Sequence, residues 1–288
     1  MRVKIFGDGC IHVITNLSSI LEGIKLDSIE VSAGGSAANV ALQLKKLNKD
    51  VDFFGVVGKD PLGDIFCNEL KENHIHTDFI VREGKTHKVL IGLNTPSEAK
   101  VVISPGIEDI KLIKKYINHV EDGDIVYIPG FKEYEDILVD ISRKNCTVFT
   151  DYGHLSLGLE AESTYLDGLI KISEYSDVVL ASGFAFTKNI CDEIAVSLSG
   201  SRCKLVIITF AGDGIAVITP KYQTYYKTNK LPVMNNVGAG DSFMAAVIYG
   251  YIQKWEIDEI IEFAHKVAEY KISHFNNFAT MKNIMNRR

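Results

Sequence analysis

The sequence predicts an α/β protein in which a mostly parallel sheet is flanked by helices and a smaller β region is attached. Short apolar segments alternate with helical patterns along most of the chain, which is typical of parallel strands joined by crossover helices. Two extended segments, one after the first strand and one near residue 90, interrupt this alternation and predict the smaller region. With 288 residues, of which 46% are hydrophobic, the chain can bury a large core.

The overall charge and the cysteines narrow the classes of partner. A net charge of −6 gives no general attraction to nucleic acid or to an anionic membrane, so we expect a small-molecule ligand and neither of those partners. The five cysteines are odd in number and lack a CxxC pair, as in reduced cytosolic proteins. No apolar run reaches membrane-spanning length, and the first residues do not form a signal peptide. We therefore expect a cytoplasmic protein.

The first strand, residues 3–6, ends at Gly7-Asp8. Ligands collect at the carboxyl ends of strands in open α/β sheets, so Asp8 is a candidate contact, although it could instead bond its own turn. Residues 12–15 and 30–31 look extended and form the first excursion from the main sheet.

A diglycine turn, Gly34-Gly35, then leads into a helix whose apolar face carries Val40, Leu44 and Leu47. Asn39 lies in the first turn of this helix among alanines, where a polar side chain needs a partner. That partner could be a ligand hydroxyl or a nearby backbone group.

Residues 51–58 predict a strand, and Asp60-Pro61 predict the cap and first position of the next helix. His74 and His76 share one face of an extended segment, but two imidazoles without a third ligand make a poor metal site. We expect a surface or structural role for both.

The second excursion consists of residues 89–93 and 101–103, joined through residues 95–98 as a β-hairpin. We expect the two excursions to pair into a small sheet that covers the site. Such a cover would exclude water from the chemistry beneath it.

Regular alternation fills the rest of the chain. The predicted strands are residues 125–128, 146–150, 177–180 and 205–209, and the predicted helices are residues 109–120, 133–143, 164–175 and 187–199. A hairpin through residues 212–214 leads into a strand at 215–218, and residues 222–226 and 257–273 predict a further strand and the last helix.

Near the C-terminus, Gly238 and Gly240 precede a helix that has no polar stripe after its first serine, so we expect this helix to be buried. The start of a buried helix, with glycines beside it, suits an anion. Asp241 is anomalous there because a carboxylate beside an anion site is costly unless it has a task. The alternative is that Asp241 only caps the helix.

Three motifs in this order resemble the ribokinase family of carbohydrate kinases, also called the phosphofructokinase B type. They are GGSAANVA at residues 34–41, GVVGKDPLG at residues 55–63 and GAGDSF at residues 238–243. The similarity runs over essentially the whole chain, and Gly7-Asp8-Gly9-Cys10 also resembles the fructosamine-kinase-like branch.

The resemblance implies a ribokinase-like three-layer sandwich. Residues 1–10, 32–84 and 106–288 would form the main domain, and residues 11–31 and 85–105 a small β lid. It also implies an enzyme that uses ATP and Mg²⁺ to phosphorylate a hydroxyl of a sugar or polyol.

By this resemblance Asp241 is the general base, and the N–H groups of Gly238, Ala239 and Gly240 form an anion hole. A base beside an anion hole suits phosphoryl transfer, because the attacking oxygen and the transferred group are adjacent in the transition state. The substrate would contact Asp8, Cys10, His12, Gly34, Gly35 and Asn39, and the nucleotide would contact Thr209, Ala211 and Gly214. No metal ligand is assigned.

Four departures from the family pattern surround these motifs. His12 stands where many members carry aspartate, and Cys10 where ribokinases carry asparagine, so a bidentate carboxylate grip on two sugar hydroxyls is missing. That argues against ribose itself. The second departure is Ser182-Gly183-Phe184-Ala185 in place of the family's Asn-x-x-Glu, whose glutamate is associated with magnesium. The third is that Asp151 is the only residue retained from the family's Asp-x-Asn-x-Arg pattern. In the fourth, Asn235-Asn236-Val237 replaces Asp-Thr-x before the anion hole, and Ala211 replaces a glycine of the nucleotide loop.

Alternatives remain open at this point. A nucleoside kinase of the same fold would use His12 to pack on a base, and a non-catalytic sugar- or nucleotide-binding regulator would explain the missing glutamate at Ala185. A dinucleotide-binding oxidoreductase is disfavoured because no GxGxxG follows the first strand. Apolar lid strands could also pair between two copies, which makes a homodimer an alternative to a monomer.

Overall fold

A computed structural model describes residues 2–16, 29–95, 98–106, 109–152, 162–183, 188–228, 235–274 and 278–285. The chain divides into two compact units, residues 1–116 with 232–288 and residues 117–231. This division follows a different line from the main domain and lid expected from the sequence, and that assignment stays a prediction.

The first unit contains a parallel sheet in the order β1 (Val3–Asp8), β4 (Val51–Val57) and β5 (Ile80–Arg82). Most residues of β1 and β4 are buried, as expected where helices cover a parallel sheet on its faces. The rings of Phe6 and Phe54 stack at 4.7 Å between centroids. Helix α2 (Ser36–Lys46) precedes β4 in the chain, and helix α3 (Pro61–Glu72) follows it.

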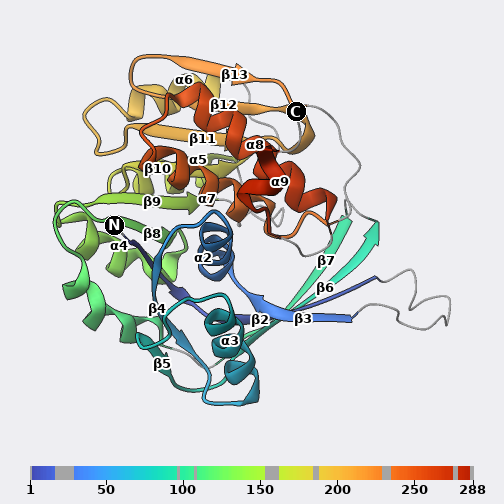
Figure 1. Cartoon of the computed structure of the whole chain (residues 1–288). Coiled ribbons are helices and arrows are strands. Elements are labelled where there is room, and N and C mark those ends of the chain that lie inside the picture. The colour runs from blue at the N-terminus through green and yellow to red at the C-terminus, as the bar shows by residue number, and fades with distance from the viewer. Residues whose placement is uncertain are drawn as a thin grey trace. The chain divides into compact units, whose positions relative to one another are not determined.

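A second sheet of the first unit has the order β3 (Ile29–Gly34), β2 (Cys10–Asn16), β6 (His87–Thr95) and β7 (Glu98–Ser104). The β2–β6 pair is parallel and the other two pairs are antiparallel, as Figure 1 shows. The two excursions from the main sheet therefore pair with each other, as expected. Ile14 and Ile91 lie buried on one face of this sheet.

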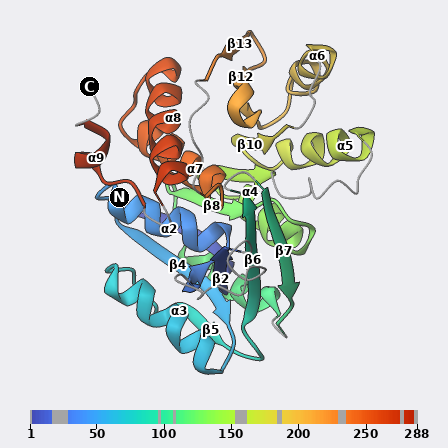
Figure 2. The ribbon, with the colours of Figure 1, turned by 90° about the vertical axis from the view of Figure 1, so that its right-hand side faces the viewer.

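Three C-terminal helices complete the first unit: α7 (Ala239–Ile252), α8 (Ile257–Ser273) and α9 (Met281–Met285). Helix α7 packs against both α2 and α8 (Figure 2). Because apolar residues surround it on all sides, α7 is buried from Ser242 to Ile248, as predicted. The short α9 was not predicted, since five residues carry too little periodicity to recognise.

The second unit contains four parallel strands in the order β11 (Leu205–Thr209), β10 (Val178–Ser182), β9 (Thr147–Tyr152) and β8 (Ile125–Pro129). Two antiparallel strands, β12 (Ile215–Ile218) and β13 (Gln223–Tyr226), extend this sheet beyond β11. The helices are α4 (Glu135–Ser142), α5 (Glu162–Ser173) and α6 (Lys188–Ser197). Each matches a predicted helix.

One predicted helix has a different type. Residues 110–119 form a 3₁₀-helix, η1 (Ile110–His119), where the sequence analysis expected an ordinary helix at 109–120. Ile110, Ile113 and Tyr116 recur at every third residue, the period of a 3₁₀-helix, which brings them onto one side. Two shorter 3₁₀ turns are η2 (Lys132–Tyr134) and η3 (Ala211–Asp213).

Two expectations about composition can be compared with the described residues. All five cysteines are free thiols. None of the helices within the described ranges combines the length and the apolarity needed to cross a bilayer.

Candidate active site

The glycine-rich stretch forms the start of α7. Gly238 is the N-cap and takes φ 75°, a left-handed conformation that favours glycine. A Cβ on Gly240 would meet nothing within 4 Å, so open space adjoins the backbone there. The N–H of Ala239 donates to the carbonyl of Asn236 (3.2 Å), so this predicted anion-hole group is already engaged.

Asp241 lies in the first turn of α7, and its side chain does not cap the helix. Its Oδ2 accepts a hydrogen bond of 2.6 Å from Nδ2 of Asn39, which lies in the first turn of α2 and is 6% exposed. The capping alternative is therefore wrong. The partner of Asn39 is a carboxylate 202 residues away along the chain, a kind of partner that the sequence analysis did not consider, and contact with a ligand stays a prediction.

The diglycine turn is held by His12 of β2. Nε2 of His12 accepts a hydrogen bond of 3.2 Å from the N–H of Gly35, which has φ 95° and precedes α2. A Cβ on Gly34 would overlap the His12 ring, so Gly34 provides the room for that ring. His12 thus fixes the backbone at the start of the helix that carries Asn39.

Asp8 and Cys10 lie beside the same turn. The Asp8 carbonyl oxygen and Sγ of Cys10 are each 3.5 Å from the position that a Cβ on Gly35 would take. Cys10 is 5% exposed, whereas Asp8 is half-buried at the end of β1. The structure therefore brings together the six residues predicted to contact the substrate.

The loop before α7 is tied to α8 and to the second sheet. Asn235 is fully buried; its Oδ1 accepts from the N–H of Val237 (2.9 Å), and its own N–H donates to the Ile272 carbonyl (3.2 Å). Val237 packs on Ile14 and Ile91 of the second sheet. Within the described part of the chain, Asn235 Nδ2 and Ser242 Oγ have no hydrogen-bond partner.

Lys271 of α8 was missed by the sequence analysis. It is 2% exposed, and its Cε lies 3.3 Å from the position of a Cβ on Gly238. Burial lowers the pKa of Lys271 to about 8, and the charges of Asp241 and Glu30 oppose that shift. The detectable signal was its place on the apolar stripe of the last helix, one turn after Val267.

The motif at residues 55–63 has a structural role. Asp60 caps α3 by accepting from the N–H of Gly63 (2.9 Å), and it also accepts from the N–H (2.9 Å) and Oγ1 (2.5 Å) of Thr86. A Cβ on Gly58 would overlap the backbone of Thr86. The motif therefore fixes the segment that enters β6.

The three residues predicted to contact the nucleotide lie in the second unit. Thr209 ends β11, and Ala211 and Gly214 lie in the turn before β12. Ala211 takes φ 49° where the family pattern has glycine, so this position keeps a left-handed backbone despite its side chain. Gly214 has φ 139°, and a Cβ there would overlap the Tyr225 hydroxyl group.

Asp151 and Ser182, which belong to two of the departures from the family pattern, are both described. The buried carboxylate of Asp151 accepts from the Tyr127 hydroxyl group at 2.8 Å, and the Ser182 carbonyl accepts from Tyr165 at 2.9 Å. Ala185 lies outside the described residues. Across the described ranges, no group of three or more His, Cys, Asp or Glu side chains could hold a metal ion.

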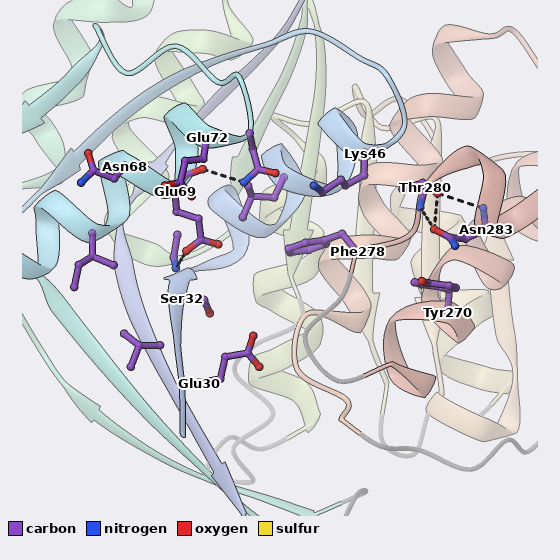
Figure 3. A pocket seen from close by; sticks show the side chains of 15 residues that line it. Glu30, Ser32, Lys46, Asn68, Glu69, Glu72, Tyr270, Phe278, Thr280 and Asn283 are labelled. Atoms are coloured by element: carbon purple, nitrogen blue, oxygen red, sulfur yellow. Dashed lines mark hydrogen bonds between the residues drawn. The ribbon is translucent and has the colours of Figure 1, made fainter. Parts of the chain in front are cut away.

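A cavity of about 730 Å³ in the first unit lies elsewhere, and none of the predicted site residues lines it. Figure 3 shows Glu69 and Glu72 of α3 on one side, and Tyr270 and Phe278 on the other. Burial raises the pKa of Glu69, although its carboxylate accepts from the Ala33 N–H at 2.5 Å.

A family model described as pfkB family carbohydrate kinase matches residues 3–153 and 174–282. A 5-dehydro-2-deoxygluconokinase from Clostridium botulinum is 26% identical over 261 residues, covering 80% of this chain and 75% of that protein. Fructosamine kinase FrlD from Bacillus subtilis is 24% identical over 242 residues and covers 82% of each chain.

Among solved structures, a ribokinase from Thermotoga maritima superposes with a TM-score of 0.78 at 17% identity, covering 99% of this chain and 98% of that chain. At this identity the likeness shows the fold alone: a ribokinase-like α/β fold with a large, mostly parallel sheet flanked by helices. The fold expected from the sequence is confirmed.

Proposed function

Because the chain belongs to the pfkB family of carbohydrate kinases, which phosphorylate sugars with ATP, we propose that the start of α7 is its phosphoryl-transfer site. The observation that carries this proposal is the 2.6 Å hydrogen bond between Asn39 and Asp241. It fixes a carboxylate in the first turn of a buried helix, where the helix N-terminus also favours an anion.

In this proposal Asp241 is the general base. Oδ2 accepts from Asn39, which orients the carboxylate and leaves Oδ1 to take the proton of the attacking hydroxyl group. The N–H groups of Gly238 and Gly240 face the transferred phosphoryl group, and Ala239 joins them only if its bond to Asn236 opens. The dipole of α7 adds to the stabilisation of the developing charge.

The phosphate donor is proposed to be ATP bound with Mg²⁺. We infer that Mg²⁺ is held in its usual way, through substrate phosphates, water and one or two carboxylates. When bound, the metal neutralises charge on the phosphates. Thr209, Ala211 and Gly214 are proposed to contact the nucleotide.

The acceptor is proposed to be a sugar or sugar-like hydroxyl compound bound near Asp8, Cys10, Gly34, Gly35 and Asn39. His12 is proposed to act mainly by holding the Gly35 backbone, because its Nε2 is already an acceptor there. Two similar proteins are named for a deoxygluconate derivative and for fructosamine, which makes ketose-like acids and amine-substituted ketoses the first acceptors to test.

The second sheet, with residues 11–31 and 85–105, is proposed to act as the lid. Its support is that Ile14 and Ile91 of this sheet pack on Val237. Val237 directly precedes Gly238, so it belongs to the anion-hole loop, residues 235–240. Closure over this loop would exclude water, which otherwise competes with the sugar for the phosphoryl group.

The outer face of the same sheet is proposed to join two copies of the chain. The strand register places Val31, Val13, Leu90 and Val102 in one row across four strands. Val31, Leu90 and Val102 are 47%, 44% and 61% exposed. A continuous apolar row of this kind favours association.

The experiment that tests the function measures ADP formation over a panel of sugars, ketose acids, fructosamines and nucleosides with MgATP, together with thermal shifts for the same compounds. We expect ADP formation and stabilisation with at least one sugar or sugar acid. Turnover of nucleosides alone would replace the sugar by a nucleoside. Stabilisation without any ADP release would indicate a binding protein instead.

A further inference from the structure

Lys271 lies beneath the point where α7 begins. Its Cε is within 3.3 Å of the position of a Cβ on Gly238, and its ammonium group is 4.7 Å from the centroid of the Phe278 ring. The next residue, Ile272, binds the loop through the Asn235 N–H (3.2 Å). The lysine and its neighbour therefore support the anion-hole loop from the side of α8.

The charged groups that act on Lys271 come from two other elements, Asp241 of α7 and Glu30 of β3. Both favour the protonated amine, whereas burial disfavours it. Because the resulting pKa of Lys271 is about 8, the side chain is mostly cationic at neutral pH. A positive charge is thus buried beneath a site proposed to bind phosphate.

The positive charge of Lys271 would reduce an electrostatic repulsion at the proposed site. The carboxylate of Asp241 and the phosphate group of ATP repel each other, and the repulsion grows where the bound substrates displace water. The dipole of α7 offsets part of it. An unbranched apolar side chain would fill the same space without the cost of burying an amine, so packing alone does not explain a lysine here.

We propose that Lys271 is a positioning residue for phosphoryl transfer, whose ammonium group offsets the repulsion between Asp241 and the transferred phosphoryl group and supports the turn at Gly238. The inference rests on the proposed function of Asp241. It concerns the rate of the chemical step more than sugar binding, because charge accumulates at the anion hole during transfer.

The test compares Lys271→Met with Lys266→Met, a control on the same helix whose exposed ammonium group pairs with Glu262 at 2.6 Å. We expect Lys271→Met to lower kcat about tenfold or more, with the sugar KM changed less than about threefold. We also expect the parent enzyme to lose kcat above about pH 8, where Lys271 loses its proton, and Lys271→Met to lack that decline. Lys266→Met should behave like the parent.

A folded Lys271→Met enzyme with the parent kcat, or with the same decline above pH 8, would overturn the inference. If Lys271→Met does not fold, Lys271→Arg replaces it: the charge remains, so kcat should stay within about threefold of the parent and the decline above pH 8 should vanish. A tenfold loss in Lys271→Arg would contradict the role of the charge.

Asp241→Asn separates this inference from the proposed function. Loss of activity in Asp241→Asn with normal kcat in Lys271→Met would overturn only the role of Lys271. Full activity in Asp241→Asn would overturn the proposed site itself.

Discussion

At the scale of single residues, the site consists of groups held by partners from distant parts of the chain. Asn39 orients Asp241 across 202 residues, and His12 fixes the turn at Gly35 from a different strand. The motifs at residues 34–41 and 238–243 thus act on each other directly. The polar side chain of Asn39, which lies among small residues, therefore has a partner: its amide donates to one oxygen of the Asp241 carboxylate.

The burial of Lys271 predicts how the free energy of unfolding changes with pH. Its pKa is about 8 in the folded protein and about 10.5 when unfolded, so above pH 8 the folded state releases the proton first. The cost of burying the charge is present in full below pH 8 and is relieved as the pH rises towards 10.5. The free energy of unfolding of the parent, relative to Lys271→Met, should therefore rise by up to about 3 kcal/mol over that window.

The measurement is chemical denaturation of both proteins at pH 7, 8, 9 and 10. Taking the difference between them cancels the titration of the other lysines and tyrosines. A difference that stays constant from pH 7 to pH 10 would show that Lys271 does not titrate in this window.

At the scale of elements, we propose that the start of α7 is shaped for a bound phosphate group rather than for helix stability. Gly240 is in the first turn, where open space surrounds the position of a Cβ. Gly240→Ala should therefore leave the free energy of unfolding unchanged or raise it by up to about 1 kcal/mol, since alanine restricts the unfolded chain. The added methyl group should obstruct the phosphate, and we expect the KM for ATP to rise or kcat to fall about tenfold.

Denaturation and steady-state kinetics on the same sample check this prediction. The informative result is stability without activity, because a folding defect would lower both. A Gly240→Ala enzyme with parental kinetics would place the phosphate elsewhere.

The turn before β12 makes a second prediction at this scale. Ala211 has φ 49°, a left-handed conformation that costs an alanine about 1–2 kcal/mol and a glycine almost nothing. After the greater entropy of unfolded glycine is subtracted, Ala211→Gly should stabilise the protein by up to about 1 kcal/mol. The matched control is Ala216→Gly in the adjoining strand β12, which should destabilise by about 1 kcal/mol. Equal losses in both variants would contradict the strain at Ala211.

The sequence predicted elements better than it predicted contacts. Apolar segments located most of the described strands, although the short β5 was not predicted; Asp60 marked the start of α3, and the glycines at 238 and 240 marked the start of α7. It could not predict the Asn39–Asp241 bond, because periodicity assigns residues to a face and does not identify the partner. The role of Lys271 could not be predicted for a related reason. A lysine within an apolar stripe gives no sign of its partners until the neighbouring helix is known.

At the scale of the whole molecule, the second sheet has two apolar faces, one buried and one exposed to solvent. Ile14 and Ile91 are buried against Val237, whereas the row that includes Leu90 and Val102 is exposed. A single copy of the chain leaves that row in water. The proposed lid and the proposed dimer therefore use opposite faces of the same sheet.

This arrangement predicts the oligomeric state. Val102→Glu should convert a dimer into a monomer, because it places a charge within the apolar row. Light scattering after size exclusion measures the mass, and Val196→Glu serves as the control, since Val196 is 75% exposed on α6, far from the row in sequence. A parent protein that is monomeric at all concentrations would contradict the dimer and leave the kinase site untouched.

The central claim is that Asp241 removes the proton of the sugar hydroxyl group during phosphoryl transfer. It is tested most directly by the kcat of Asp241→Asn with MgATP and the sugar that gives the highest rate in the panel. Asparagine keeps the size of the side chain but cannot act as a base, so we predict a loss of at least about 100-fold in kcat in a protein that still folds and binds sugar. A kcat equal to that of the parent would contradict the account.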